Sequence, residues 1–188
     1  IESQLYQRQA LKKKSTNFKN TLPKIQSDLA NQMLKDPYKL EFLSMGREIK
    51  ERELEKGLVE HITKFLLELG IGFAFVGNQY HFEIGGQDYY IDLLFYHLKL
   101  RCYIVIELKT DEFKPEYTGK LNFYLSAIDD ILKLPDDNQS LGMILCKNNN
   151  KIVAEYALRN IKTPIGISEY KLKTSLPSIK DIEAGLNF

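Results

Sequence analysis

Two carboxylates and a lysine stand in the most apolar stretches of this chain. Asp92 lies within Tyr-Ile-Asp-Leu-Leu at residues 90–94, and Glu107 and Lys109 lie within Val-Ile-Glu-Leu-Lys at residues 105–109. A carboxylate that is buried among apolar side chains costs free energy unless it is paired with a cation or binds a metal. These three residues are therefore candidates for a polar site inside the fold.

The spacing of the three residues predicts that they meet. The fifteen residues from Asp92 to Glu107 are enough for one strand to turn and a second to return beside it. Glu107 and Lys109 are two apart, so their side chains share one face of a strand. Close carboxylates repel each other unless a cation neutralises them, and hard oxygen ligands suit Mg²⁺ or Mn²⁺. Such an ion activates water and polarises a phosphoryl oxygen, while Lys109 offsets transition-state charge.

The same residues also allow a purely structural interpretation. Lys109 could form a buried ion pair with Glu107 or with Asp92, and ion pairs of this kind occur without any catalytic role. A Glu-x-Lys in a strand is common by itself. The upstream Asp inside a second apolar strand makes the pattern more specific, but the spacing alone leaves both interpretations open.

The elements expected around these residues alternate between helix and strand. Apolar residues at helical spacing predict a long helix over 47–69, which Gly70 ends. Alternating segments predict strands over 72–84, 88–96 and 101–108, with a hairpin turn at Gly85-Gly86. A helix over 115–134, a strand over 141–146, a helix over 151–160 and a strand over 165–170 follow. The expected fold class is α/β, a mixed sheet flanked by helices.

The first part of the chain carries extra helices. We expect helices over 2–14 and from Pro23 to the residues before Asp36-Pro37, with a loop over 15–22. We therefore divide the chain into a helical segment, 1–46, and a main domain, 47–188. Because the chain begins at Ile1 and not at Met, we interpret 1–46 as the tail of a truncated N-terminal region. Its expected role is packing or homo-oligomer formation.

The net charge of +1 gives no overall sign of a polyanionic partner. The basic residues are unevenly placed, however. Six of them and no acid fall in one N-terminal stretch: Arg8, Lys12, Lys13, Lys14, Lys19 and Lys24. Such an arm can bind phosphates without sequence preference, or it can be a solvated connection that binds nothing.

Other sequence features indicate the class of protein. No apolar run reaches the roughly 18 residues that span a bilayer, so no membrane association is expected. Cys102 and Cys146 lie in apolar runs without a zinc-like spacing, which favours buried, reduced thiols in a cytoplasmic protein. The three histidines have no Cys or His partner at metal spacing, and no phosphate-binding G-x-x-x-x-G-K-[ST] occurs.

A longer stretch carries a family resemblance. Residues 67–132, which hold YYIDLLFY and VIELKTDEF, resemble the PD-(D/E)XK nuclease superfamily and, more closely, its YhcG-like bacterial family; LGMILCKNNN, AEYAL and PIGISEY extend the likeness to residue 170. The resemblance implies a restriction-endonuclease-like αβββαβ core. It implies a metal-dependent endonuclease that hydrolyses DNA phosphodiester bonds, in DNA defence, repair or recombination. It also implies Asp92 and Glu107 as Mg²⁺ or Mn²⁺ ligands, a share in coordination for the Leu108 carbonyl, and Lys109 as the catalytic lysine.

The resemblance implies further site residues. Such nucleases add an acid from the first core helix, and Glu55 fits this position better than Glu60, although both also suit a solvated helix face. The family often has Arg where this chain has Asn78, so a phosphate contact there is in doubt. Polar groups expected to line the site, each with ordinary core or rim packing as the alternative, are Gln79, Tyr117, Lys120 and Tyr124.

Three functions are consistent with the sequence. The first is an active, metal-dependent endonuclease acting on DNA, which the acid–acid–lysine pattern and the resemblance both favour. The second is a catalytically weak or inactive module that binds nucleic acid or takes part in an assembly, in keeping with the near-zero net charge. The third is a structural dimer domain in which the charged residues form only a buried ion pair.

Overall fold

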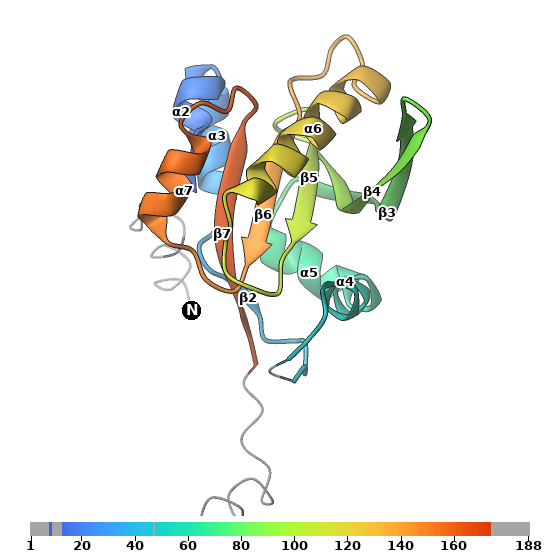
Figure 1. The fold of residues 1–188 in the computed structure, drawn as a ribbon, viewed down its shortest axis with the longest axis vertical. Helices are drawn as coiled ribbons and strands as arrows, with labels where there is room; N and C mark the ends of the chain where they lie inside the picture. Colours follow the sequence, from blue (N-terminus) through green and yellow to red (C-terminus); the bar gives the residue numbers. More distant parts are fainter. Residues whose placement is uncertain (1–7, 9–12, 47, 174–188) are drawn as a thin grey trace, which may run out of the picture.

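A mixed sheet with helices on both faces forms the body of the molecule (Figure 1). The computed structural model describes residue 8 and residues 13–46 and 48–173. The strands of these ranges are β1 (Ser15–Thr16), β2 (Tyr38–Leu40), β3 (Phe73–Ile84), β4 (Gln87–His97), β5 (Cys102–Leu108), β6 (Leu141–Cys146) and β7 (Ile165–Leu172). The helices are α2 (Phe18–Thr21), α3 (Lys24–Met33), α4 (Glu51–Glu60), α5 (Ile62–Leu69), α6 (Glu116–Ile131) and α7 (Lys151–Leu158). No helix in the described ranges is long and apolar enough to cross a bilayer.

The sheet changes from antiparallel to parallel at β5. Its strands lie in the order β1-β7-β6-β5-β4-β3, and β2 pairs with β7 beside this path. β3, β4 and β5 are antiparallel neighbours, whereas β5, β6 and β7 run parallel. Gly85 and Gly86 turn the β3–β4 hairpin with φ values of 62° and 75°, which side chains with a Cβ rarely adopt. The helices α6 and α7 make the crossovers that parallel strands require. The predicted α/β class with a mixed sheet is confirmed.

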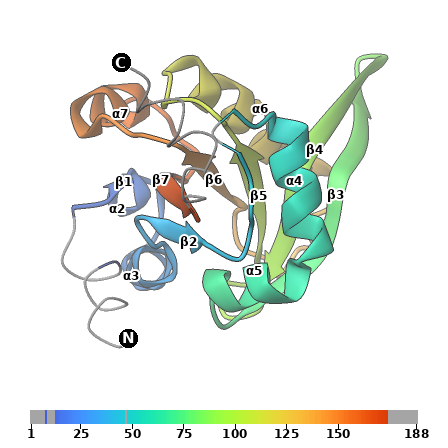
Figure 2. The same cartoon turned by 90° about the horizontal axis from the view of Figure 1, so that it is seen from below.

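Each face of the sheet packs against its own group of helices. Figure 2 shows α6 and α7 on one side of the sheet, with α3, α4 and α5 on the other. Along β5, Ile104 and Ile106 enter one apolar cluster and Val105 enters the other. This explains the continuous apolar run of β5, because a central strand that is buried on both faces has no solvated positions. Cys102 and Cys146 are buried and free, as their apolar surroundings predicted.

The helix predicted over 47–69 is two helices in the structure. α4 begins at Glu51. The backbone N–H of the preceding residue, Lys50, donates a hydrogen bond of 3.0 Å to Glu53 Oε2. The chain leaves helical geometry at His61, where φ is −112° and ψ is 34°, and α5 begins at the next residue. His61 Nδ1 lies 3.1 Å from the Gly57 carbonyl at this break. The apolar stripe is continuous through the break, so the pattern alone gave no sign of it.

The segment before residue 47 is part of the same sheet and is not only helical. The predicted loop over 15–22 contains β1, antiparallel to β7, and the short helix α2. β2 pairs with β7 in parallel, and Phe18, Leu34 and Tyr38 belong to one of the two core clusters. The predicted helix over 2–14 falls almost entirely outside the described residues, and its last two residues, Lys13 and Lys14, are not helical. The domain boundary near residue 46 and the role of this segment in self-association stay predictions.

A glycine on β6 sets how closely α6 approaches the sheet. A Cβ at Gly142 would lie 2.7 Å from Leu121 Cδ2 and 3.0 Å from Leu125 Cδ1 on α6. We predict that Gly142→Ala lowers the free energy of unfolding by about 1–3 kcal/mol, because the buried Leu121 and Leu125 side chains of α6 must move to make room. Gly119 lies within α6, where an added Cβ would meet nothing within 4 Å. Gly119→Ala should therefore stabilise the protein by up to about 1 kcal/mol. Urea denaturation measures both, and a Gly142→Ala protein as stable as the wild type would contradict the close approach.

Candidate active site

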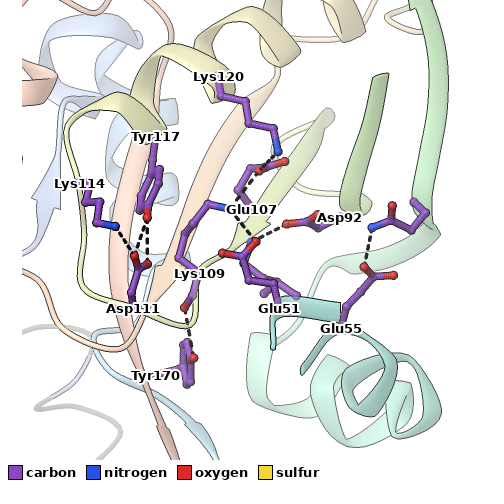
Figure 3. A network of polar contacts seen from close by, with 12 residues as sticks. Glu51, Glu55, Asp92, Glu107, Lys109, Asp111, Lys114, Tyr117, Lys120 and Tyr170 are labelled. Carbon is purple, nitrogen blue, oxygen red and sulfur yellow. Dashed lines mark hydrogen bonds and ion pairs between the residues drawn. The ribbon is translucent and has the colours of Figure 1, made fainter. Parts of the chain in front are cut away.

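Asp92 on β4 and Glu107 on β5 occupy facing positions of two antiparallel strands. The β4–β5 ladder pairs Leu93 with Ile106, so Asp92 and Glu107 come next in the same register. Side chains that are directly opposite in an antiparallel pair project to the same face. Asp92 Oδ2 also accepts a hydrogen bond of 2.9 Å from the Leu108 backbone N–H (Figure 3). The two carboxylates are thus brought together, and the end of β5 is tied to the middle of β4.

Glu107 is almost completely buried, with an exposed fraction of 1%. Its Oε2 accepts a hydrogen bond of 2.8 Å from Lys120 Nζ on α6 and lies 3.9 Å from Lys109 Nζ. Its Oε1 is buried and has no hydrogen-bond partner among the described residues. Burial raises the pKa of Glu107 to about 7, the nearby charge of Asp92 adds to the rise, and Lys120 and Lys109 only partly offset it. One oxygen of this carboxylate is therefore available to a ligand.

Lys109 follows directly after β5 and is held from several sides. Its Nζ lies 3.1 Å from Glu51 Oε2, at the start of α4, and 5.1 Å from the centre of the Tyr117 ring. Its backbone N–H donates to the Leu145 carbonyl at 2.8 Å, and its own carbonyl accepts a hydrogen bond of 3.2 Å from the Tyr170 hydroxyl. The backbone contacts fix where the strand ends, and the ring and the carboxylate fix where the ammonium points.

Glu55 on α4 adds a second buried carboxylate on the β4 side of the site, next to the half-buried Asp92. Asn78 Nδ2 donates to Glu55 Oε1 at 2.9 Å, and Gln79 Nε2 donates to Glu55 Oε2 at 2.5 Å. Gln79 has a positive φ of 45°. Its neighbours in β3 pair with Leu93 and Ile91 of β4, so Gln79 lies opposite Asp92. Burial raises the pKa of Asp92, the Leu108 N–H lowers it, and the charge of Glu55 adds to the net rise. The structure thus gives Asn78 and Gln79 a shared partner, Glu55.

Three other residues predicted to line the site occupy different surroundings. Lys120 belongs to the site because it donates a hydrogen bond to Glu107. Burial lowers the pKa of Lys120, but the charge of Glu107 and the hydrogen bond to Glu107 raise that pKa overall. Tyr124 is mostly core, packed edge-on to Phe82, with the Lys120 ammonium 5.1 Å from its ring. Tyr117 donates hydrogen bonds of 2.9 and 2.8 Å to the two oxygens of Asp111.

Glu60, the second acid considered on the first core helix, is not brought to the site. Its carboxylate is exposed and lies 3.8 Å from Lys56 Nζ, one helical turn earlier on α4. Glu60 therefore occupies a solvated helix face, and Glu55 is the acid of α4 that the fold turns toward Asp92.

The charges of the site do not balance. Four carboxylates, those of Glu51, Glu55, Asp92 and Glu107, face the ammonium groups of Lys109 and Lys120. If all six groups are ionised, two negative charges remain, which is the charge that one divalent cation neutralises. Within the described ranges no group of three or more His, Cys, Asp or Glu side chains is placed so that it could hold a metal ion. Mg²⁺ does not need such a group, since it keeps several waters and takes one or two carboxylates. The unpartnered Glu107 Oε1 beside Asp92 fits that donor set.

Comparisons with known proteins show the family of the chain. The family model "YhcG PDDEXK nuclease domain" matches residues 31–186. The Escherichia coli (strain K12) protein named "Putative nuclease YhcG" is 36% identical over 174 residues, which cover 92% of this chain. The chain belongs to the YhcG PDDEXK nuclease family. It spans 46% of the length of the E. coli relative, so it corresponds to less than half of that YhcG protein.

Solved structures of two endonucleases resemble this YhcG-family domain in fold. The EndoMS–dsDNA2 complex matches with a TM-score of 0.45 and 15% identity, over 69% of this chain and 46% of that chain. A repair endonuclease from Pyrococcus abyssi matches with a TM-score of 0.42 and 12% identity, over 66% of this chain and 48% of that chain. Similarity at this level says nothing about the substrate of the YhcG-family domain.

Two acids of the YhcG-family site were missing from the sequence prediction. Glu51 lies only four residues before Glu55, but its partner Lys109 is 58 residues away, so no local pattern joins them. Asp111 follows Lys109 by two residues, and that spacing was a usable signal for a group near the end of β5. It forms a salt bridge of 2.7 Å with Lys114 and accepts the Tyr117 hydroxyl. The predicted metal-binding and catalytic roles of Asp92, Glu107, Leu108, Lys109 and Glu55 stay predictions.

We predict that the metal-free protein loses stability as pH rises through the range in which Glu107 ionises. Its folded pKa, about 7, lies above the unfolded value of 4.5, so the folded chain binds more protons between these two pH values. The stabilising contribution is therefore complete below the lower value and lost by the upper one, and it amounts to on the order of 3 kcal/mol.

Urea denaturation in EDTA across this pH range tests the prediction on wild type and Glu107→Gln. The substitution should remove most of the pH slope, and Asp92, whose pKa is also raised, should account for part of what remains. Glu83→Gln, at an exposed position of β3, is the matched control and should keep the wild-type slope. A slope in wild type that Glu107→Gln leaves unchanged would contradict the assignment.

Proposed function

We propose that this nuclease domain is a metal-dependent endonuclease that hydrolyses phosphodiester bonds of DNA, in DNA defence, repair or recombination. Asp92 and Glu107 would hold a single Mg²⁺ or Mn²⁺, with the Leu108 carbonyl sharing in coordination. The observation that carries the proposal is the buried, unpartnered Oε1 of Glu107 beside the half-buried carboxylate of Asp92. A buried carboxylate oxygen without a hydrogen-bond partner costs free energy in a purely structural ion pair. A metal ligand, in contrast, needs an oxygen that has no other partner.

A bound divalent cation would supply Lewis-acid activation of the phosphodiester and of a water molecule. The protein's own groups position the rest of the reaction. Lys109, held by Glu51 and by the Tyr117 ring, would place a positive charge where negative charge develops on the phosphate. Lys120 fixes the orientation of Glu107 from α6. Glu55, with both of its oxygens held by amides, adds negative charge next to Asp92.

A second candidate is a nucleic-acid-binding or assembly module with weak catalysis or none. One observation favours it: Glu107 Oε2 already has Lys120 at 2.8 Å and Lys109 at 3.9 Å, so a partly neutralised ionic network exists without a metal. In that case the network would serve the fold, and a divalent cation would bind weakly or not at all.

We predict that the purified protein cuts DNA with Mg²⁺ or Mn²⁺ and stops cutting when EDTA is added. Glu107→Gln and Asp92→Asn should each lower kcat by roughly a hundredfold or more, because each removes a metal ligand. Lys109→Met should lower kcat by a similar factor while the affinity for Mn²⁺, measured by titration calorimetry, stays within about threefold of the wild-type value. That split separates a ligand from a group that stabilises the transition state.

Glu60→Gln is the matched control, because Glu60 is an exposed acid of the same helix as Glu55. It should leave kcat and Mn²⁺ affinity unchanged. Equal cutting by Glu107→Gln and wild type would assign the activity to a contaminant. Binding of DNA without cutting under any divalent ion would support the second candidate instead.

A further inference from the structure

A basic cleft of about 1270 Å³ lies apart from the candidate active site. Its walls come from residues before and within α2, from α3, from the end of α5 and from the turn between β4 and β5. We define the basic cleft by the charged residues that line it: Lys13, Lys14, Lys19, Lys35, Lys99 and Asp28. Among the described lining residues, Asp28 is the only acid. Three of the five lysines belong to the basic stretch between residues 8 and 24, for which the sequence left phosphate binding and simple solvation open.

Four of the five lysines of the basic cleft have no salt bridge among the described residues; the fifth, Lys13, has an exposed one of 3.5 Å with Glu155. Lys14 Nζ donates to the Asn31 carbonyl and Lys35 Nζ to the Glu68 carbonyl, and neither ammonium has a salt bridge among the described residues. Burial lowers the pKa of Lys14 to about 8 and also lowers the pKa of Lys35. Lys19 and Lys99 are exposed and have no carboxylate partner in the described ranges. The charges of Asp36 and Glu68 offset only part of these pKa shifts, and desolvated ammonium groups that lack a salt bridge are costly unless an anion binds them.

Neutral polar groups lie among these cations. Thr16, Asn20, Asn31 and Gln32 line the same cleft. Protein contacts to phosphate oxygens and sugars combine lysines with hydroxyl and amide side chains of this kind. We propose that the basic cleft binds the sugar–phosphate backbone of a nucleic acid, without sequence preference, at a site separate from the candidate active site.

The position of the cleft keeps it out of the chemical step. His97, which lines the cleft, is five residues beyond Asp92 on β4, roughly 17 Å along a strand. About five base pairs of duplex cover that distance. Residues of the cleft therefore act on affinity and placement, and not on the reacting phosphate. Binding there does not depend on whether the carboxylate site is catalytic.

A nucleic acid fits the cleft better than an anionic membrane does. A membrane surface is broad, whereas these lysines line a concave space between α3, α5 and the β4–β5 turn. The chain belongs to a nuclease family, and DNA, the substrate proposed above, is itself a polyphosphate. The same polymer would then contact the protein at two places.

The test measures the binding of labelled duplex and single-stranded DNA in EDTA by fluorescence anisotropy, over a range of salt concentrations. Lys19→Gln together with Lys99→Gln should weaken both DNAs about tenfold and reduce the slope of log K against log salt by about 2, one unit for each lost phosphate contact. Each single variant is compared with Lys133→Gln, an exposed lysine after α6 that is not in the lining, which should bind as wild type does. Unchanged thermal unfolding would show that the variants fold.

Two outcomes would overturn the proposal. In the first, the double variant keeps the wild-type DNA affinity and salt slope. In the second, the double variant loses binding only to phosphatidylserine vesicles, measured in parallel, and not to DNA. Catalysis is tested separately. Glu107→Gln should bind DNA with the same salt slope as wild type even if it cannot cut. With Mg²⁺ and saturating DNA, the double variant should retain the wild-type kcat. If neither the wild type nor any variant cuts DNA, the proposed function is wrong, but the proposed binding at the basic cleft is unaffected.

Discussion

The closeness of a buried carboxylate, Glu107, to a half-buried one, Asp92, is the constraint on which the arrangement of this domain depends. Asp92 and Glu107 lose hydration in an apolar sheet and repel each other, so folding must supply positive charge and hydrogen-bond donors at the same place. The donors come from different parts of the chain: the Leu108 N–H from β5 and the Lys120 ammonium from α6. Because one carboxylate oxygen still has no donor, the protein's own groups leave the repulsion only partly offset.

The change of strand direction at β5 explains why the charges gather where they do. β5 has an antiparallel neighbour on one side and a parallel neighbour on the other, so its C-terminal end faces the start of the crossover helix α6. Lys109 follows that end, and α6 returns Lys120 over Glu107. Gly142 on the neighbouring strand leaves room for α6 to lie close to the sheet. The position of Lys120 over Glu107 thus depends on packing on the face where α6 lies.

The sequence was most informative where the signal is local. Apolar surroundings and a two-residue spacing were enough to single out Asp92, Glu107 and Lys109, and two glycines were enough for the β3–β4 turn. It was least informative where pairing across the chain decides the structure. β1 is two residues long and becomes a strand only because β7, some 150 residues later, pairs with it. The Glu51–Lys109 contact is likewise invisible to any window of neighbouring residues, since it joins a helix start to a strand end.

The backbone of Lys109 is anchored by Leu145 on β6 and by Tyr170 on β7, although the lysine itself precedes both strands in the chain. During synthesis on a ribosome, Asp92, Glu107 and Lys109 emerge first and these two anchors emerge later. The last of them is 61 residues beyond Lys109. A nascent chain that ends soon after Lys109 therefore still lacks the contacts that hold this lysine in place. The charged centre acquires its final geometry only as the parallel half of the sheet assembles.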